Sequence, residues 1–215
     1  MNYIAIDTSG KNLTIVICKQ GKIFSYFDNE CGVKHSEKIM VELENLILKA
    51  DYDIKSSSFI GCVVGAGSFT GIRIGVATVK ALCFAYSLPF LSLTSFDTIA
   101  YNKKDDKVLA VIDAGHNGFY VAGYQEGKVV LPPSYIMIDE LKNLSSQYSI
   151  LSLTDLSQIE SQKVDSLTGL INAIEEKKDQ TERDLEKLIP LYVRKSQAEE
   201  GRCFLKKFPL TTFVI

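Results

Sequence analysis

The sequence predicts an α/β protein built from a duplicated unit, and therefore a fold with two related lobes. Three observations lead to this prediction: an internal repeat at an offset of 106 residues, strand and helix patterns that follow each copy, and a glycine-rich loop between a strand and a helix. The chain has 215 residues, 46% of them hydrophobic, which suits one compact body or two small lobes.

The repeat appears as an apolar run that ends in aspartate. The distance from this Asp to the glycine of the second turn is 14 residues in both copies. Each copy predicts three antiparallel strands joined by an Asp-led turn and a tight Gly-Lys turn. The matched segments are residues 3–7 with 109–113, 13–17 with 119–123, and 20–23 with 126–129.

Helices and strands are expected to alternate after the first copy. Apolar residues recur at helical spacing over residues 35–50, which predicts an amphipathic helix. A buried strand over 59–64, a helix over 72–86 and a strand over 90–93 follow, and Ser95 is expected to cap a short helix.

A charged turn over residues 102–107 is the expected boundary between the lobes. In the second lobe, helices are expected near 139–144 and over 166–177. The predicted domains are an N-terminal lobe over 1–103, a C-terminal lobe over 104–200, and a tail of unassigned role over 201–215.

A duplicated, Asp-led unit of strands and helices is typical of the superfamily of actin, hexokinase and the heat-shock ATPases, an actin-like (ASKHA, RNase H-like) fold. There, the two Asp-led turns face nucleotide phosphates through a metal ion. Asp7, Thr8 and Asp113 are therefore candidates for a nucleotide site. Alternatively, each Asp only starts a tight turn by bonding its own backbone, and both interpretations stay open at this stage.

Four glycines, Gly65, Gly67, Gly71 and Gly75, lie between the predicted strand and helix of the first lobe. Backbone N–H groups at such a helix start favour anions. However, the spacing fits neither G-x-x-x-x-G-K-[ST] nor G-x-G-x-x-G. A structural turn is the favoured interpretation of this glycine loop.

The predicted helix over 72–86 carries only two charged residues, Arg73 and Lys80. A helix so apolar is either enclosed in a core or half covered by a partner. Together with the helix over 35–50, it would form half of a four-helix bundle across a subunit interface.

Composition excludes several classes of protein. A formal net charge of −2 does not fit a basic nucleic-acid binder. The longest apolar stretch, over 72–93, is interrupted by Arg73, Lys80 and Pro89, and the first residues lack the basic segment of a signal peptide. Five cysteines without a C-x-x-C pair indicate reduced thiols. We therefore expect a cytoplasmic protein, neither secreted nor inserted in a membrane.

Histidine content argues against metal and triad chemistry. The chain has two histidines, His35 and His116, and lacks an H-E-x-x-H motif. His35 is expected at a helix start, and His116 is expected to face solvent beside Asn117 and Gly118. No metal site is therefore predicted.

Several segments of the chain resemble the bacterial TsaB (YeaZ) family. These are Asp7-Thr8-Ser9, His35-Ser36-Glu37, the glycine loop over 67–75 (GSFTGIRIG), and residues 190–194 (PLYVR) followed by Ala198-Glu199. The resemblance covers about residues 1–200, and the long glycine-loop string is its most specific part. Ala66 stands where the family usually has proline.

The resemblance implies a role in making N6-threonylcarbamoyladenosine in tRNA, next to the anticodon. In that family, also filed under glycoprotease-like (peptidase M22) names, the chain is a catalytically silent paralogue of TsaD. TsaD carries a metal-binding His-x-x-x-His and transfers the threonylcarbamoyl group, and the ATPase TsaE joins the pair. We thus expect a non-catalytic activating scaffold that dimerises with TsaD, or with itself when alone, and that meets tRNA only within the complex.

The resemblance also places the expected docking face on the helices over 35–50 and 72–86. We expect Val76→Glu or Val79→Glu to abolish association without unfolding the chain. No cofactor is expected to be required, and Asp7, Thr8 and Asp113 become remnants that bind ATP or ADP weakly, with a subunit interface favoured for any such binding. The expected interface residues are His35, Ser36, Ile39, Met40, Leu43, Ile72, Arg73, Val76, Val79 and Lys80.

Two other functions remain as alternatives. The first is an active ATPase or kinase of the actin-like superfamily that uses Asp7 and Asp113, although 215 residues leave little room for adenosine-binding insertions. The second is a peptidase, which the missing histidine pair disfavours. Five basic residues between Arg194 and Lys207 could contact tRNA phosphates, but a solvated tail is favoured.

Overall fold

The computed structural model describes residues 1–104 and 106–194, and its strands form two sheets of five strands each. The predicted tail over 201–215, and most of the basic stretch before it, lie outside the described residues. The first sheet contains β1 (Tyr3–Asp7), β2 (Leu13–Lys19), β3 (Lys22–Asp28), β4 (Phe59–Val63) and β5 (Phe90–Leu93). The second contains β6 (Lys107–Gly115), β7 (Gly118–Gln125), β8 (Lys128–Met137), β9 (Ser149–Ser152) and β10 (Gln162–Lys163).

The two sheets share one topology, which confirms the duplicated α/β fold. The strand orders are β3-β2-β1-β4-β5 and β10-β9-β6-β7-β8, so β6 takes the place of β1. In each sheet the first three strands form an antiparallel meander, and the last two run parallel to the first. The turns between β2 and β3, β6 and β7, and β7 and β8 use paired positive φ angles, as at His116 and Asn117, which suit the twist of two-residue hairpins.

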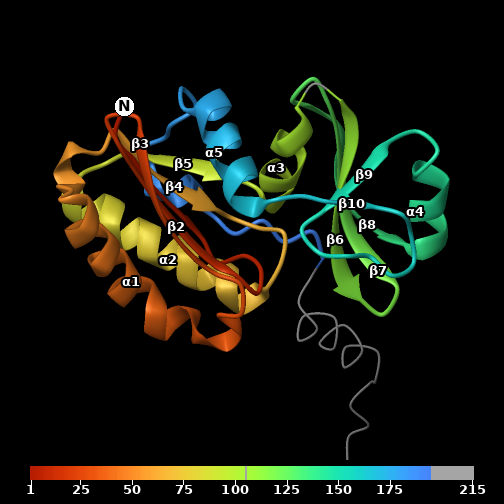
Figure 1. Cartoon of the computed structure of the whole chain (residues 1–215), viewed down its shortest axis with the longest axis horizontal. Helices are drawn as coiled ribbons and strands as arrows, with labels where there is room; N and C mark the ends of the chain where they lie inside the picture. Colours follow the sequence, from red (N-terminus) through yellow and green to blue (C-terminus); the bar gives the residue numbers. More distant parts are fainter. Residues whose placement is uncertain (105, 195–215) are drawn as a thin grey trace, which may run out of the picture.

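Helices complete a layered body. They are α1 (His35–Ala50), α2 (Phe69–Tyr86), α3 (Ser95–Ala100), α4 (Ile138–Leu144) and α5 (Ser166–Lys177), with short 3-10 turns η1 (Gly32–Lys34), η2 (Ile54–Ser56), η3 (Tyr101–Lys103) and η4 (Leu185–Lys187). In Figure 1, α1 and α2 cover the outer face of the first sheet, α4 covers the outer face of the second, and α3 and α5 lie between the sheets.

The central layer joins the two lobes into one hydrophobic core. Its buried members include Phe59 of the first sheet, Val108 of the second, Phe96 of α3 and Leu170 of α5. A Cβ at Gly169 would overlap the carbonyl oxygen of Thr98, so α5 approaches α3 at backbone distance. The lobes are therefore related in topology, and they share one hydrophobic core rather than having separate cores alone.

Most predicted helices appear with the expected bounds, and one predicted cap was wrong. The helix over 35–50 and the helix over 166–177 are α1 and α5. The N-cap of α3 is Thr94 rather than Ser95. Thr94 Oγ accepts from the Asp97 N–H at 3.1 Å, and the Thr94 N–H donates to the Asp97 carboxylate at 2.7 Å, which forms a capping box.

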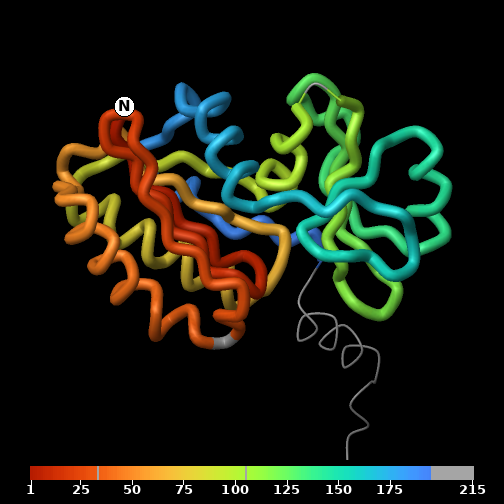
Figure 2. Tube along the Cα trace, viewed as in Figure 1, coloured from red at the N-terminus to blue at the C-terminus, as the bar shows by residue number. Residues whose placement is uncertain are grey.

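The C-terminal part of the predicted second lobe returns to the first sheet. Glu182 pairs with Phe90 on the edge of β5, and the Leu191 N–H donates to the Val64 carbonyl at 2.7 Å. Figure 2 shows this blue segment passing from α5 back behind the strands of the first lobe. Residues 182–194, called the strap below, therefore pack the end of the described chain against β5 and against the residues that lead into α2.

The cysteines of the described residues and one side of the longest helix lie in the interior. Cys18, Cys31, Cys62 and Cys83 are free and buried. In the described part of the chain, α2 is the one helix with the length and composition of a membrane span. Its buried residues belong to the first-lobe core, as expected for the core helix of a globular domain.

Candidate docking face and the Asp-led turns

The most exposed large apolar side chains of the described residues lie on α1 and α2. Phe84 of α2 is 80% exposed and Leu48 of α1 is 72% exposed. Both helices start at the sheet edge where β1 and β4 end, because each leads back to the beginning of a parallel strand. The two helices lie side by side in Figure 1. Leu48 and Phe84 each stand in the last turn of their helix, so both lie toward the same end of the helix pair.

We call this surface the docking face and define it by ten of the exposed or half-exposed side chains of the two helices. An exposed apolar surface of this kind is typical of a protein–protein contact. Its residues are Ser36, Met40, Val41 and Leu48 of α1, and Arg73, Ala77, Lys80, Ala81, Phe84 and Ala85 of α2.

The structure corrects six of the expected interface residues. Their side chains are buried in the chain's own first core, where they pack between the helices and the sheet, so they are not available to a partner. Charged substitutions at Val76 or Val79 would therefore unfold the lobe, contrary to the expectation from sequence. The six residues are His35, Ile39, Leu43, Ile72, Val76 and Val79.

His35 has a structural role in the described chain. Its ring Nε2 lies 2.9 Å from the carbonyl oxygen of Asn12, which ties the start of α1 to the first hairpin. Of the other expected residues, Ser36, Met40 and Arg73 are exposed and Lys80 is half-exposed.

The charged residues of the docking face lie on α2. The sequence of α2 contains Arg73 and Lys80 and no acidic residue, whereas the charges exposed on α1 are of both signs, among them Glu37, Glu44 and Lys49. The α2 side is therefore basic and apolar. A partner surface that faces it is expected to be acidic, because like charges across an interface are costly.

The first Asp-led turn is closed by its own chain. The Asp7 carboxylate accepts the Ser9 N–H at 2.8 Å and the Ser9 hydroxyl at 2.6 Å, and Ser95 Oγ donates to Ser9 Oγ at 2.8 Å. Burial raises the pKa of Asp7, and the two bonds from Ser9 offset this only in part.

The glycine loop packs directly on this turn. The Ser68 N–H donates to the Ser9 carbonyl at 2.6 Å, and Thr8 Oγ donates to the Gly71 carbonyl at 2.7 Å. A Cβ at Gly67 would overlap the Ser9 carbonyl, and one at Gly71 would overlap that of Thr8. The loop's glycines therefore permit close backbone contact.

The same contacts extend to the two ends of the loop. Gly65 lies against the Leu191 carbonyl, and the peptide between Gly65 and Ala66 is cis. At the other end, Gly75 lies against the Thr8 hydroxyl. A nucleotide bound through a metal needs an accessible carboxylate, and Asp7 does not fit that role.

The second Asp-led turn is open. Asp113 is exposed and accepts the Gly115 N–H at 2.8 Å, and a Cβ at Gly115 would meet no atom within 4 Å. His116, in the same turn, is exposed as expected. Within residues 1–104 and 106–194, no three His, Cys, Asp or Glu residues form a group that could hold a metal ion.

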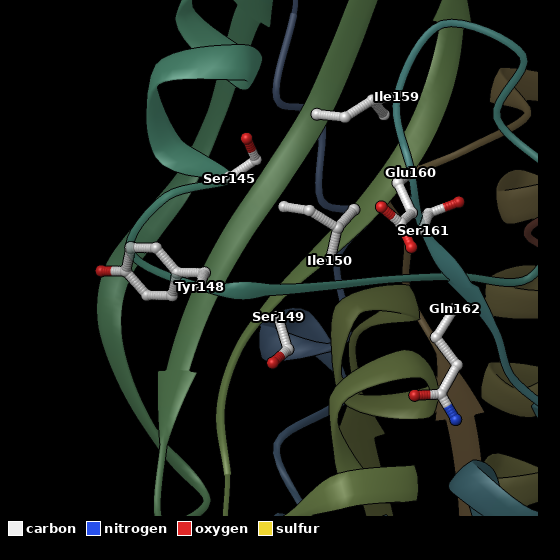
Figure 3. A pocket seen from close by; sticks show the side chains of 8 residues that line it. All are labelled: Ser145, Tyr148, Ser149, Ile150, Ile159, Glu160, Ser161 and Gln162. Carbon is white, nitrogen blue, oxygen red and sulfur yellow. The ribbon is translucent and has the colours of Figure 1, made fainter.

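A separate pocket of about 500 Å³ lies in the second lobe (Figure 3). It lies between the residues that follow α4 and the connection from β9 to β10, away from the docking face. Isoleucine side chains and polar groups share its wall, and none of these residues was predicted from the sequence. They are Ser145, Tyr148, Ser149, Ile150, Ile159, Glu160, Ser161 and Gln162.

Sequence reasoning did not name seven docking-face or neighbouring residues: Val41, Leu48, Ala77, Ala81, Phe84, Ala85 and Tyr192. Val41 and Leu48 are apolar residues outside the buried stripe of the amphipathic helix α1, which was a usable signal. Tyr192 lies in the strap, and nothing near it in sequence indicates its contact with α2.

Two lobes of one Asp-led topology, packed around a shared central helical layer, define a protein of the actin-like class. Solved structures support this fold. YeaZ from Pseudomonas aeruginosa superimposes with a TM-score of 0.67 at 18% sequence identity, and the match covers 89% of this chain and 99% of that chain.

Sequence comparisons identify the family. The model of TsaD, tRNA N6-adenosine threonylcarbamoyltransferase, matches residues 29–168, more than half of the chain. The TsaB protein of Bacillus subtilis is 25% identical over 93% of this chain and 96% of its own length, and that of Escherichia coli is 26% identical over 69% of each. The chain belongs to the TsaB (YeaZ) family of tRNA threonylcarbamoyladenosine biosynthesis proteins, within the wider group matched by the TsaD model.

Proposed function

We propose that the chain is a non-catalytic scaffold that activates a TsaD-type paralogue in the synthesis of N6-threonylcarbamoyladenosine in tRNA. The observation that carries the proposal is the docking face, where Leu48 and Phe84 stay exposed on two adjacent helices. A paralogue with the same fold would present equivalent helices, and two helix pairs form a four-helix bundle. The TsaB relatives from Bacillus subtilis and Escherichia coli are named as tRNA threonylcarbamoyladenosine biosynthesis proteins.

The first Asp-led turn supports the non-catalytic part of the proposal. Asp7 is buried and bonded to Ser9, so it does not offer an open carboxylate to a metal. The sequence also lacks the His-x-x-x-His that the resemblance assigns to the TsaD subunit, since His35 and His116 are 81 residues apart. Weak binding of ATP or ADP, with a subunit interface as the favoured place, and recruitment of a TsaE-type ATPase and of tRNA to the assembled pair belong to the same proposal.

Light scattering on a sizing column, followed by calorimetric titration with the TsaD-type paralogue of the same cell, tests the proposal. The wild-type chain is expected to form a 1:1 complex. Phe84→Asp places a charge in an apolar contact and is expected to lower the affinity at least about 30-fold, as for an interface hot spot.

Val129→Asp is the matched control, because Val129 is a large apolar residue of β8 in the second lobe and is 51% exposed. It is expected to bind like the wild type. Failure of the wild-type chain to form a complex, or turnover of ATP by the isolated chain, would overturn the proposal. ATP turnover would favour the alternative of an actin-like ATPase or kinase.

A further inference from the structure

The strap places an aromatic residue against the first turns of α2. The Tyr192 ring stacks on Phe69, with ring centroids 4.7 Å apart and an interplanar angle of 25°. Its hydroxyl accepts a hydrogen bond from Arg73 Nε at 2.8 Å. The guanidinium carbon of Arg73 lies 3.8 Å from the centroid of the Phe69 ring. Three residues from two distant segments thus form one cluster at the start of the docking face.

This cluster contacts the face and the Nε atom of the Arg73 guanidinium. The guanidinium is held by a cation–π contact on its face and by one hydrogen bond at Nε. Among residues 1–104 and 106–194, nothing accepts a hydrogen bond from the two terminal NH₂ groups, and Arg73 is exposed. Two parallel N–H donors on a planar group match the two oxygens of a carboxylate.

The surroundings of Arg73 favour a protein carboxylate over a nucleic-acid phosphate. Ala77, Ala81 and Phe84 follow Arg73 on the exposed side of α2, at the spacing of one helical face. A continuous apolar stripe suits a partner helix, whereas phosphate-binding surfaces are rich in Lys and Arg. Lys80, the other cation on this helix, is half-exposed.

We propose that Tyr192 is a positioning residue that holds Arg73 in place so that its terminal NH₂ groups bind a carboxylate of the TsaD-type partner. This inference rests on the proposed function and adds a specific polar contact to it. Pre-ordering matters here because an arginine loses considerable side-chain entropy when it is fixed on binding. The contact with Tyr192 would hold the Arg73 side chain in one conformation before the partner binds.

A double-mutant cycle with the full chain and the TsaD-type paralogue tests the inference. Tyr192→Phe removes the hydroxyl and keeps the ring on Phe69, so the affinity is expected to fall about 3- to 10-fold. Arg73→Ala is expected to lower the affinity about 10- to 100-fold and to weaken its dependence on salt. In the Arg73→Ala background, Tyr192→Phe is expected to have no further effect, because the hydroxyl acts through the arginine.

Two controls separate positioning from stability. Tyr148→Phe removes a hydroxyl from a half-exposed tyrosine of the second lobe and is expected to leave the affinity unchanged. Arg73→Lys keeps the charge but loses the paired donors, so it is expected to bind more weakly than the wild type despite an unchanged melting temperature.

The outcomes distinguish this inference from the proposed function. If the wild-type pair forms and Tyr192→Phe binds as tightly as the wild type, the positioning role is wrong and the scaffold role stands. If Arg73→Ala leaves pairing intact but weakens tRNA binding by the assembled complex, the ligand of Arg73 is a phosphate and the inference is overturned. If no pair forms with the wild type, the proposed function itself fails.

Discussion

The two Asp-led turns have the same place in the topology but opposite environments. Asp7 ends β1 and is covered by the glycine loop, while Asp113 stands near the end of β6 and is exposed. The difference comes from the connection after the fourth strand of each sheet. After β4 the chain forms the glycine loop and α2, whereas residues 153–161 after β9 contain no helix. The environment of a repeated motif is thus set by a distant crossover connection.

The same asymmetry separates the outer faces of the lobes. The first sheet is covered by α1 and α2, with 16 and 18 residues, and the second by α4, with 7 residues. The docking face therefore exists on one lobe, and the pocket of the other lobe lies beside the connection that has no helix. The two lobes share one topology, but only the first lobe has two long helices on its outer face, and these form a surface suited to a partner.

The largest effect is expected from filling the space between the glycine loop and the first turn. In Gly67→Ala, the new Cβ would overlap the Ser9 carbonyl at a residue with φ of +148°, so the free energy of unfolding should fall by about 5 kcal/mol or more. Gly115→Ala, in the open second turn, has a positive φ but free space, and about 1–2 kcal/mol is expected. Urea denaturation measures both, and equal losses would contradict the comparison.

The next largest effect is expected at the polar contact that joins the lobes. Asp97 of α3 is buried and binds Lys177 of α5 at 2.7 Å and the Tyr124 hydroxyl of β7 at 2.9 Å. Asp97→Ala leaves Lys177 and Tyr124 without this partner, removes the carboxylate of the α3 capping box as well, and is expected to cost about 3–5 kcal/mol.

Asp155→Ala serves as the control for that substitution, since its ion pair with Lys163 is exposed and worth about 0–1 kcal/mol. Thermal unfolding followed by calorimetry reports both values. Because the two lobes share a core, Asp97→Ala should still unfold in one transition. Separate transitions for the two lobes would show that they are less coupled than their packing indicates.

The smallest effect concerns the protonation of Asp7. Burial raises the folded-state pKa of Asp7 above its unfolded value near 3.8. Below that value the carboxyl is neutral in both states, and as pH rises from there through the folded pKa the wild type loses stability. Asp7→Asn removes this loss, so its stability relative to the wild type should increase as the pH rises above about 4. Urea denaturation at a series of pH values measures the difference, and a difference that does not change with pH would contradict the prediction.

Local patterns predicted the frame of this molecule well, because they depend on short-range regularities. The repeated strand ending in Asp, the amphipathic stripe of α1 and the span of α5 were all readable in this way. Membership of the family was also predicted, from the glycine-loop string above all. The cap at Thr94 was misplaced by one residue, since Thr94 and Ser95 are both good caps and only the bond to Asp97 decides between them.

The docking face lies on the two helices named from the sequence, but three residues predicted for it on α2, Ile72, Val76 and Val79, are buried. This helix is apolar around most of its circumference, so periodicity does not distinguish Val76 and Val79, which fill the core, from Ala77 and Ala81, which are exposed. The strap was unpredictable for another reason. Tyr192 and Arg73 are 119 residues apart, and their contact depends on tertiary packing alone.

The return of the strap to the first sheet also bears on how the protein is made. Leu188 belongs to the first-lobe core, and Glu182 and Leu191 bond to Phe90 and Val64, yet all three are synthesised about 90 or more residues after the first sheet. At typical rates of translation the ribosome needs roughly 5–20 s to cover that interval. For that time the nascent N-terminal lobe has an open strand edge and an unfilled core, and it is completed only when nearly all of the described chain has emerged.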